Sequence, residues 1–236
     1  HMIGYYSKKF YTMAHAEFII GGVASTYRYE TIRNLNFYDT DTSTEDIGLS
    51  MKVVSKGNRN QRIIYAADVV ASTEGVQTFK GLLKQRYRWK LGSLQNLIKY
   101  RSMVGSFSRD FYPSLTFYRI PMAFFSEVML MTQPLILGYI FYLSVLYQTF
   151  GFLIGAYMTI TAFVLCTLWP DEHHSVLDKI RLSLYAPALY FCFYIMDLIQ
   201  VVAIVRCLGN FKQLTHRSTG HVTWVSPERV GGTAQA

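Results

Sequence analysis

Long apolar stretches dominate the second half of the chain. Residues 117–147, 152–168 and 182–208 contain few charged side chains, and a helix of about 20 residues spans the roughly 30 Å core of a bilayer. The pattern predicts three membrane-spanning helices, of which the second is only just long enough. Pro134 is expected to kink the first helix, and residues 119–127 are expected to lie in the membrane interface.

The first 110 residues carry shorter patterns that mix apolar and polar side chains, as a soluble domain does. Residues 18–35 begin with an apolar run, turn at Gly21 and Gly22 and continue at mixed spacing, which predicts a strand, a glycine turn and a short helix. Residues 62–67 predict a buried strand. We therefore expect an α/β domain in front of the membrane helices.

Two longer helices are predicted in this first part. Residues 45–56 follow a run of Ser and Thr at positions 42–44 that can supply an N-cap, and Gly57 with Asn58 is expected to end the helix. From about residue 75 or 78 to residue 99, apolar side chains recur every three or four positions and basic residues occupy much of the remaining surface. Taken alone, such a helix is typically solvated or lies on a membrane surface.

The charge distribution indicates the side of the membrane and the kind of ligand to expect. The net charge is +8, with 23 Lys and Arg against 15 Asp and Glu, and the excess lies in residues 1–110 and after Arg206. A basic part beside apolar spans fits the cytoplasmic face of a membrane and an anionic ligand such as a nucleotide diphosphate. Basic and aromatic residues do not alternate along a stripe, so no nucleic-acid partner is expected. The three cysteines lie in or beside apolar runs and predict neither a metal site nor a disulfide framework.

The charges leave the orientation of the C-terminus open. Arg206, Lys212, Arg217 and Arg229 argue for a cytoplasmic tail, whereas the acidic linker at residues 171–178 argues for the opposite side. Three crossings from a cytoplasmic domain would place the tail outside instead. Either the first apolar run is partly interfacial, which leaves two crossings, or the charge rule fails.

Polar side chains inside the apolar runs have two interpretations. Glu127 lies in the first run, and Asp197 and Gln200 share a helix face in the third. Ionisable groups at membrane depth face a bundle interior or an aqueous path. These residues therefore either line a channel or form hydrogen bonds between helices.

Two short motifs carry the candidate chemistry. One is Thr-Glu-Asp at residues 44–46, where a carboxylate at the start of a predicted helix suits a general base. The other is Gln-Arg-Tyr-Arg-Trp at residues 85–89, which combines an amide, guanidinium groups that bind phosphate, and a flat indole that can stack on a sugar. Few structural roles need all three groups on one helix.

With these motifs the chain resembles the processive, membrane-embedded family 2 glycosyltransferases, which include the cellulose, chitin, hyaluronan and poly-N-acetylglucosamine synthases. The segment GGVASTYR at residues 21–28 is similar to a degenerate form of the family's glycine-rich acceptor segment. The resemblance covers nearly the whole chain. It implies the C-terminal part of a GT-A-type nucleotide-sugar domain, followed by about three membrane-spanning helices.

The resemblance implies roles for single residues. Asp46 takes the position of the general base, with Thr44 and Glu45 as motif support. Arg86 and Arg88 take the positions that hold the donor diphosphate. Acceptor binding is assigned to Gln85, Trp89, Gly21 and Gly22.

Each of these roles has a structural alternative. Asp46 can serve as a helix cap. Trp89 can anchor the helix at the membrane interface. The two arginines can meet lipid phosphates.

The family's donor-binding half, with its metal-ligating Asp-x-Asp, has no counterpart in this sequence. Asp39 and Asp41 are expected to be loop residues, because the family's Asp-x-Asp lies on a much earlier strand. A divalent metal, Mg²⁺ or Mn²⁺, is expected for the complete enzyme, with its ligands outside this chain. We expect the chain alone to be inactive and to need an N-terminal half or a partner subunit.

The expected organisation has three parts. Residues 1–110 form a partial glycosyltransferase domain with an interfacial helix, residues 111–209 form the membrane helices, and residues 210–236 form a polar tail. The expected function is inverting transfer of a hexosyl or N-acetylhexosaminyl group from a nucleotide-sugar donor to a growing β-linked glycan, coupled to translocation. The protein is expected in the cell membrane, as a multi-pass protein with its catalytic part in the cytoplasm. The alternatives are a non-processive relative acting on a lipid-linked acceptor and a non-catalytic membrane subunit.

Overall fold

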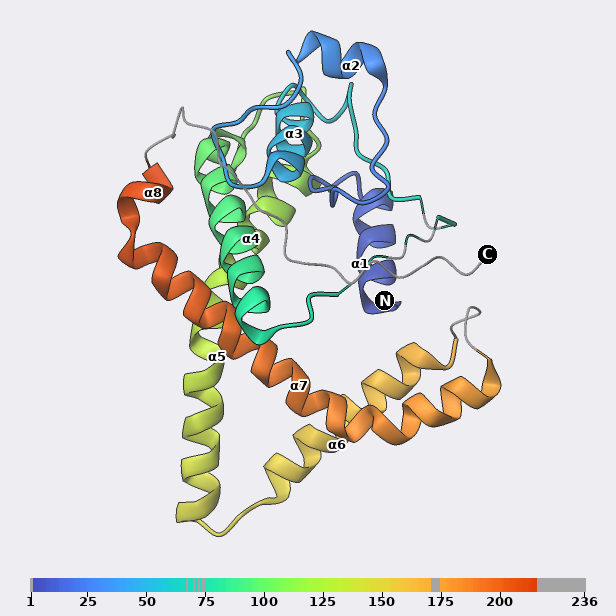
Figure 1. Ribbon diagram of the computed structural model, residues 1–236, viewed down its shortest axis with the longest axis vertical. Coiled ribbons are helices and arrows are strands. Elements are labelled where there is room, and N and C mark those ends of the chain that lie inside the picture. The colour runs from blue at the N-terminus through green and yellow to red at the C-terminus, as the bar shows by residue number, and fades with distance from the viewer. Residues whose placement is uncertain are drawn as a thin grey trace. The chain divides into compact units, whose positions relative to one another are not determined.

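The computed structural model consists of helices joined by irregular segments (Figure 1), and it describes residues 2–215 apart from 67, 70, 72, 74 and 171–174. The helices are α1 (Met2–Met13), α2 (Tyr29–Asn34), α3 (Glu45–Val54), α4 (Phe79–Lys99), α5 (Ile120–Leu146), α6 (Gly151–Leu168), α7 (Val176–Gly209) and α8 (Phe211–Thr215). A 3-10 turn follows α4 at Arg101–Met103, and a π-helical stretch at Ser114–Arg119 leads into α5.

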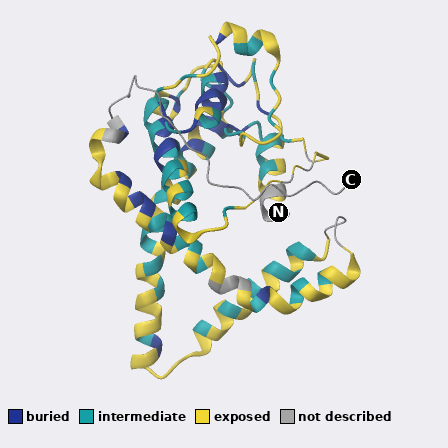
Figure 2. Ribbon diagram, in the orientation of Figure 1, coloured by how far each residue is buried: buried dark blue, intermediate teal, exposed yellow. Residues whose placement is uncertain are grey.

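The chain divides into two compact units. The membrane unit comprises His1–Lys8 and Phe125–Val201, and the motif unit comprises Lys9–Phe124 and Val202–Ala236. Most of the buried side chains lie on α3 and α4 and on the segments around them (Figure 2). Both sequence motifs belong to the motif unit.

The two helices predicted in the motif unit are present. Thr44 has an extended backbone at the N-cap of α3, and the helix ends two residues before the predicted end. Gly57 follows with a φ of 108°, a left-handed conformation that favours glycine. At α4, the Thr78 hydroxyl oxygen accepts a hydrogen bond of 3.1 Å from the Gly81 amide, which fixes the start of the helix.

The core of the motif unit packs α3 against α4. Met51 and Val54 of α3 and Leu97 of α4 are almost completely buried. They form one cluster with Phe18, Ile63, Met103, Leu115 and Ile120. Burying a large apolar side chain contributes about 1.5–3 kcal/mol, so this cluster holds the two motif-bearing helices together.

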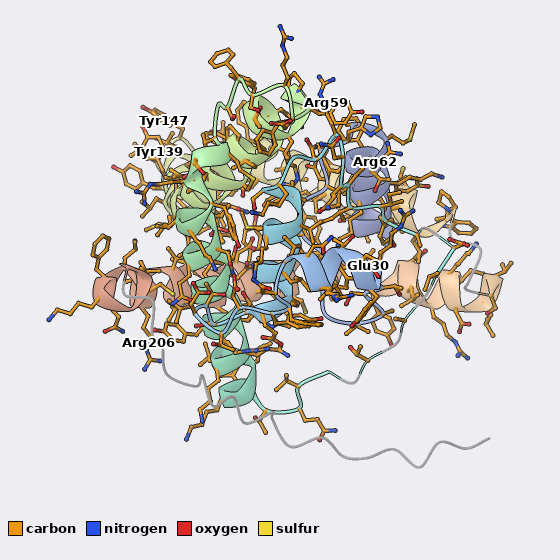
Figure 3. All side chains as sticks on the ribbon, turned by 90° about the horizontal axis from the view of Figure 1, so that it is seen from above. Glu30, Arg59, Arg62, Tyr139, Tyr147 and Arg206 are labelled. Atoms are coloured by element: carbon orange, nitrogen blue, oxygen red, sulfur yellow. The ribbon has the colours of Figure 1, made fainter. Side chains whose placement is uncertain are left out.

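A second apolar cluster lies on another part of α4. There Leu91 packs with Cys207 at the end of α7 and Leu214 of α8. The guanidinium carbon of Arg206, labelled in Figure 3, lies 5.3 Å from the centre of the Tyr87 ring. The predicted apolar face of α4 therefore packs in both clusters, and the placement of this helix at a membrane surface stays a prediction.

The predicted strands are absent from the part of the chain that the structure describes. Phe18 and Ile63 are buried as a core strand would require, but Ile64 is 63% exposed. Backbone amides in these segments bond to side chains: Ile20 N–H donates to Ser50 Oγ (3.0 Å) and Tyr65 N–H to Thr12 Oγ1 (3.0 Å). A strand needs a neighbouring backbone as hydrogen-bond partner, and these side chains take its place. The α/β prediction is therefore not confirmed by the described residues.

The three apolar runs form helices, as predicted. Ser114–Leu146, Gly151–Leu168 and Cys192–Gly209 are long and apolar enough to cross a membrane. The side chains in these spans are mostly exposed (Figure 2), and those of Tyr139 and Tyr147 project outward in Figure 3. Exposed apolar surface on helices of this length suits contact with lipid. Part of the acidic linker (171–174) and most of the polar tail (216–236) lie outside the described residues.

One polar pair joins two helices inside the membrane unit. The Gln133 side-chain amide of α5 donates a hydrogen bond of 3.3 Å to the Asp197 carboxylate of α7. Of the two interpretations of Asp197, the structure contains the hydrogen bond between helices.

Candidate active site

The Thr-Glu-Asp motif forms the start of α3. Glu45 is exposed, Asp46 is half-buried and Thr44 is 2% exposed. Asp46 Oδ1 accepts a hydrogen bond of 2.8 Å from the Ile47 amide. One carboxylate oxygen therefore supports the first turn from within the helix, whereas Thr44 occupies the N-cap position, and no hydrogen bond to Oδ2 is found among the described residues.

The glycine segment lies directly against this second oxygen. A Cβ atom added to Gly22 would lie 3.3 Å from Asp46 Oδ2, whereas one added to Gly21 would meet no atom within 4 Å. Both glycines are exposed. The structure thus places Gly22 beside the Asp46 carboxylate and leaves open space around Gly21.

Ser50 connects the glycine segment to α3. Its hydroxyl donates to the Asp46 carbonyl oxygen (2.7 Å) and accepts from the Ile20 amide (3.0 Å). The Tyr27 hydroxyl lies 3.5 Å from Ser50 Oγ. Burial raises the pKa of Tyr27, and the charge of Asp46 adds to this effect.

Neither Ser50 nor Tyr27 belongs to the motifs from which the site was predicted. Ser50 follows Asp46 by four residues, so the helical repeat could have placed it on the same face. Tyr27 lies within the glycine-rich segment at residues 21–28, but no sequence pattern indicates its contact with α3.

The Gln-Arg-Tyr-Arg-Trp motif lies within α4. The Arg86 guanidinium carbon lies 4.8 Å from the centre of the Trp89 ring, and Trp89 is 41% exposed. Arg86 Nε is buried and has no hydrogen-bond partner among the described residues. Burial lowers the pKa of Arg86. A buried guanidinium donor without a partner is suited to an anionic ligand.

The helix does not present all the motif residues on one side. Arg86 and Trp89 are three residues apart and share a face, as do Gln85 and Arg88. Arg86 and Arg88 are only two residues apart and therefore point to different faces. Gln85 and Arg88 are half-buried.

The aspartates upstream of the motif are held by lysines. Lys52 Nζ lies 2.6 Å from Asp39, and Lys99 Nζ lies 2.9 Å from Asp39 and 2.8 Å from Asp41. Burial alone would raise the pKa of Asp39, but the hydrogen bonds from Lys52 and Lys99 outweigh it and hold that pKa below its ordinary value. Burial would lower the pKa of Lys99, but its two aspartate partners raise it.

The ion pairs with lysine make the carboxylates of Asp39 and Asp41 poor ligands for a metal ion. Asp39 and Asp41 are occupied by lysine partners, and no group of three or more His, Cys, Asp or Glu side chains that could hold a metal ion occurs within the described residues. This part of the chain does not offer a fitting metal site.

Comparison with known proteins identifies relatives that are polysaccharide synthases. The chain is similar to the poly-beta-1,6-N-acetyl-D-glucosamine synthase of Staphylococcus epidermidis, with 25% identity over 241 aligned positions that cover 94% of this chain and 53% of that protein. It is also similar to the synthase of the same name from Staphylococcus aureus strain COL, with 30% identity over 115 residues that cover 49% of this chain and 25% of that protein. The chain thus spans about half the length of the first of these relatives. No solved structure matches it significantly.

The family comparison covers both motifs. The model for glycosyl transferase family group 2 matches residues 3–170. This region contains the Thr-Glu-Asp turn, the glycine segment beside it and the Arg86–Trp89 pair, together with the first two membrane-length helices. The chain belongs to glycosyl transferase family group 2.

Proposed function

We propose that this chain carries the acceptor side of the active site of a membrane-bound polysaccharide synthase. Asp46 Oδ2 takes the proton of the acceptor hydroxyl while that oxygen attacks the anomeric carbon of a nucleotide sugar. The bond from the anomeric carbon to the diphosphate breaks, the nucleoside diphosphate leaves, and attack from the opposite face inverts the configuration. The glycan grows by one β-linked sugar.

The position of Asp46 Oδ2 is the observation that carries this proposal. This oxygen has no hydrogen-bond donor among the described residues, and it faces the exposed backbone of Gly22, where an added Cβ atom would lie 3.3 Å away. A general base must come within about 2.6–3.2 Å of the proton-bearing oxygen. A carboxylate oxygen beside a glycine backbone gives an acceptor hydroxyl room to make this approach.

Arg86 and Trp89 supply the complementary binding groups. The guanidinium of Arg86 can offset the charge of a diphosphate. Trp89 presents an exposed ring suited to stacking on a sugar. A stacked chain end would remain bound between transfers, which favours processive growth.

The relatives indicate which sugar to test first. Both carry the name poly-beta-1,6-N-acetyl-D-glucosamine synthase. We therefore propose a nucleotide-activated N-acetylglucosamine as the donor and a chain of β-1,6-linked N-acetylglucosamine as the acceptor.

Family 2 glycosyltransferases generally use a divalent metal ion. Asp39 and Asp41 are paired with lysines and do not fit such an ion. No step of the proposed reaction is therefore assigned to a metal held by these residues.

The packing of the end of the chain on α4 supports one proposed membrane arrangement. The polypeptide leaves the motif unit after Phe124 and returns at Val202, and Cys207 and Leu214 then contact Leu91. A chain that leaves and re-enters on the same side crosses the membrane an even number of times, so α5 and only one further helix of the three would cross it. We propose that both segments of the motif unit lie in the cytoplasm, where nucleotide sugars are available, in agreement with their basic charge.

Nucleoside diphosphate release tests the proposal. Membranes carrying the full-length protein are incubated with UDP- and GDP-sugars, with and without short β-1,6-linked N-acetylglucosamine acceptors, and the Asp46→Asn variant serves as the blank. The expected result is acceptor-dependent release from UDP-N-acetylglucosamine and a longer product. Absence of release from every donor would contradict the enzymatic function and favour a non-catalytic subunit.

A further inference from the structure

A fully buried asparagine joins the Thr-Glu-Asp segment to the helix of the second motif. Asn96 lies on α4 with 0% exposure. Its amide nitrogen lies within hydrogen-bond distance of the Gly92 carbonyl (2.9 Å), Thr42 Oγ1 (3.2 Å) and both the carbonyl and the hydroxyl of Thr44 (3.3 and 3.4 Å). This one amide therefore bridges the helix to Thr44, two residues before Asp46.

Two glycines allow close contact between α3, α4 and the loop at residues 42–44. A Cβ atom on Gly92 would lie only 2.2 Å from Thr44 Oγ1, which is an impossible contact. A Cβ atom on Gly48 would lie 3.3 Å from both Asn96 Oδ1 and Thr42 Oγ1. The space between α3 and α4 is thus filled at this point, and close packing leaves the loop little freedom to shift.

Further side chains of α4 hold the same loop. The Ser43 amide donates a hydrogen bond of 2.8 Å to Gln95 Oε1. Lys99, one turn beyond Asn96, forms ion pairs with Asp39 and Asp41. Residues 39–44 are therefore attached to three positions of a single helix.

The hydrogen bonding of Asn96 favours a role in orienting the loop over a role in stability. Its Oδ1 atom is buried and accepts no hydrogen bond within the described part of the chain. A buried acceptor without a partner lowers stability, and an apolar side chain of similar shape would avoid this cost. The amide, in contrast, fixes where the Thr44 carbonyl lies.

We infer that Asn96 is a positioning residue for Asp46. By holding Thr44 against α4, it keeps the carboxylate of Asp46 at a fixed place relative to Arg86 and Trp89, which lie on the same helix. The base and the second motif then act as one rigid group. This role rests on the proposed function, because it assumes that Asp46 takes a proton from the acceptor.

Asn58 provides a matched control. It is also buried, at 1% exposure, and its side chain bonds to the His15 carbonyl (2.7 Å) and the Tyr112 amide (2.8 Å). It lies in the same unit but makes none of the contacts that hold the loop. Asn58→Ala and Asn96→Ala therefore remove similar buried amides, and only the second releases Thr44.

The experiment compares these variants in the full-length protein. Turnover is expressed per folded molecule, and hydrogen exchange is followed in the peptide that contains residues 42–46. Asn96→Ala is expected to reduce kcat roughly 10–100-fold, as displacements near 1 Å do, with the donor KM changed less than about twofold and with faster exchange in this peptide. Asn58→Ala is expected to keep kcat within about threefold and to leave the exchange of the peptide unchanged.

The outcomes separate this inference from the proposed function. Equal kcat in the two variants, or unchanged exchange in Asn96→Ala, would overturn the positioning role. A parent protein without turnover would contradict the proposed function, and the exchange measurement would still decide whether Asn96 holds the loop. If Asn96→Ala does not fold, Asn96→Ser removes the amide while keeping a small polar side chain, and an unchanged kcat together with unchanged exchange in that variant would contradict the inference.

Discussion

Replacing Gly22 with alanine adds one methyl group beside the proposed base. The new Cβ would lie 3.3 Å from Asp46 Oδ2 and 3.7 Å from Asp46 Cβ. Gly21→Ala adds the same group where no atom lies within 4 Å. The change in the entropy of the unfolded chain, about 0.4–1 kcal/mol for glycine to alanine, is similar at both sites. The pair thus isolates the effect of the contact with Asp46.

The magnitude follows from the space that the acceptor needs. The acceptor oxygen must come within about 2.6–3.2 Å of Oδ2, and the methyl group would occupy one side of that approach. The carboxylate must also move by a few tenths of an ångström to relieve the contact. Misplacement by about 1 Å costs about 100-fold, so this smaller shift together with the obstructed approach is expected to cost at most about 100-fold, which corresponds to at most about 2.7 kcal/mol in the barrier. Gly21→Ala is expected to change the rate less than about twofold.

Initial rates of nucleoside diphosphate release against acceptor concentration measure this effect. We expect Gly22→Ala to reduce kcat/KM for the acceptor while the KM for the donor stays nearly constant. The amount of folded protein in both variants serves as the control. Equal acceptor kinetics for Gly21→Ala and Gly22→Ala would refute the placement of the acceptor beside Asp46 Oδ2.

Other side chains give further tests. Arg86→Gln is expected to raise the donor KM about tenfold or more, because a charge-assisted hydrogen bond contributes about 1.5–3 kcal/mol; an unchanged donor KM would argue against contact with the diphosphate. The pKa of Asp39 is lowered, so its stabilising effect is present above about pH 4 and is lost as the pH falls through the folded-state value. Lys99→Met should therefore lower the melting temperature at pH 7 and do so less below about pH 4; a difference that does not depend on pH would count against the ion pairs. Lys212→Cys should react with a membrane-impermeant thiol reagent only in opened cells and Gln148→Cys also in intact cells, and the reverse pattern would contradict the proposed topology.

The sequence predicted the membrane helices and the motif helices well, because their patterns are local. The runs at 152–168 and 182–208 became α6 (Gly151–Leu168) and the larger part of α7 (Val176–Gly209). Composition and helical periodicity are sufficient for such elements. The start of α4 could also be predicted, since Thr78 caps it through a contact with a residue three positions away.

The prediction of strands is not confirmed among the described residues, because the interactions that decide between a strand and an irregular segment are not local. An apolar run such as residues 18–20 fits a strand or an irregular buried segment equally well, and the choice depends on what its amides contact. Here the Ile20 amide contacts Ser50, thirty residues away, and no pattern within the run indicates this partner. Binding of amides by side chains replaced the predicted sheet.

The residues of the candidate site also fall into two groups, those that local sequence patterns identify and those that only the fold brings together. The motif patterns identified Asp46 and Trp89 as candidates, and the structure shows what surrounds each of them. The proximity of Gly22 to Asp46 and the link from Asn96 to Thr44 join segments distant in sequence. An isolated asparagine in an amphipathic helix gives no signal of such a contact, so Asn96 could not be identified from the sequence.

A comparison of Asp46→Asn with Glu45→Gln shows whether Asp46 acts as the general base. Both changes replace a carboxylate with an amide in the first turn of α3, but only Asp46 faces the glycine segment. In the full-length protein, we expect Asp46→Asn to lower kcat about 10²–10⁴-fold, the contribution of a general base, while Glu45→Gln stays within about threefold. Equal activity of the two variants, or a larger loss in Glu45→Gln, would contradict the assignment of Asp46 as the base.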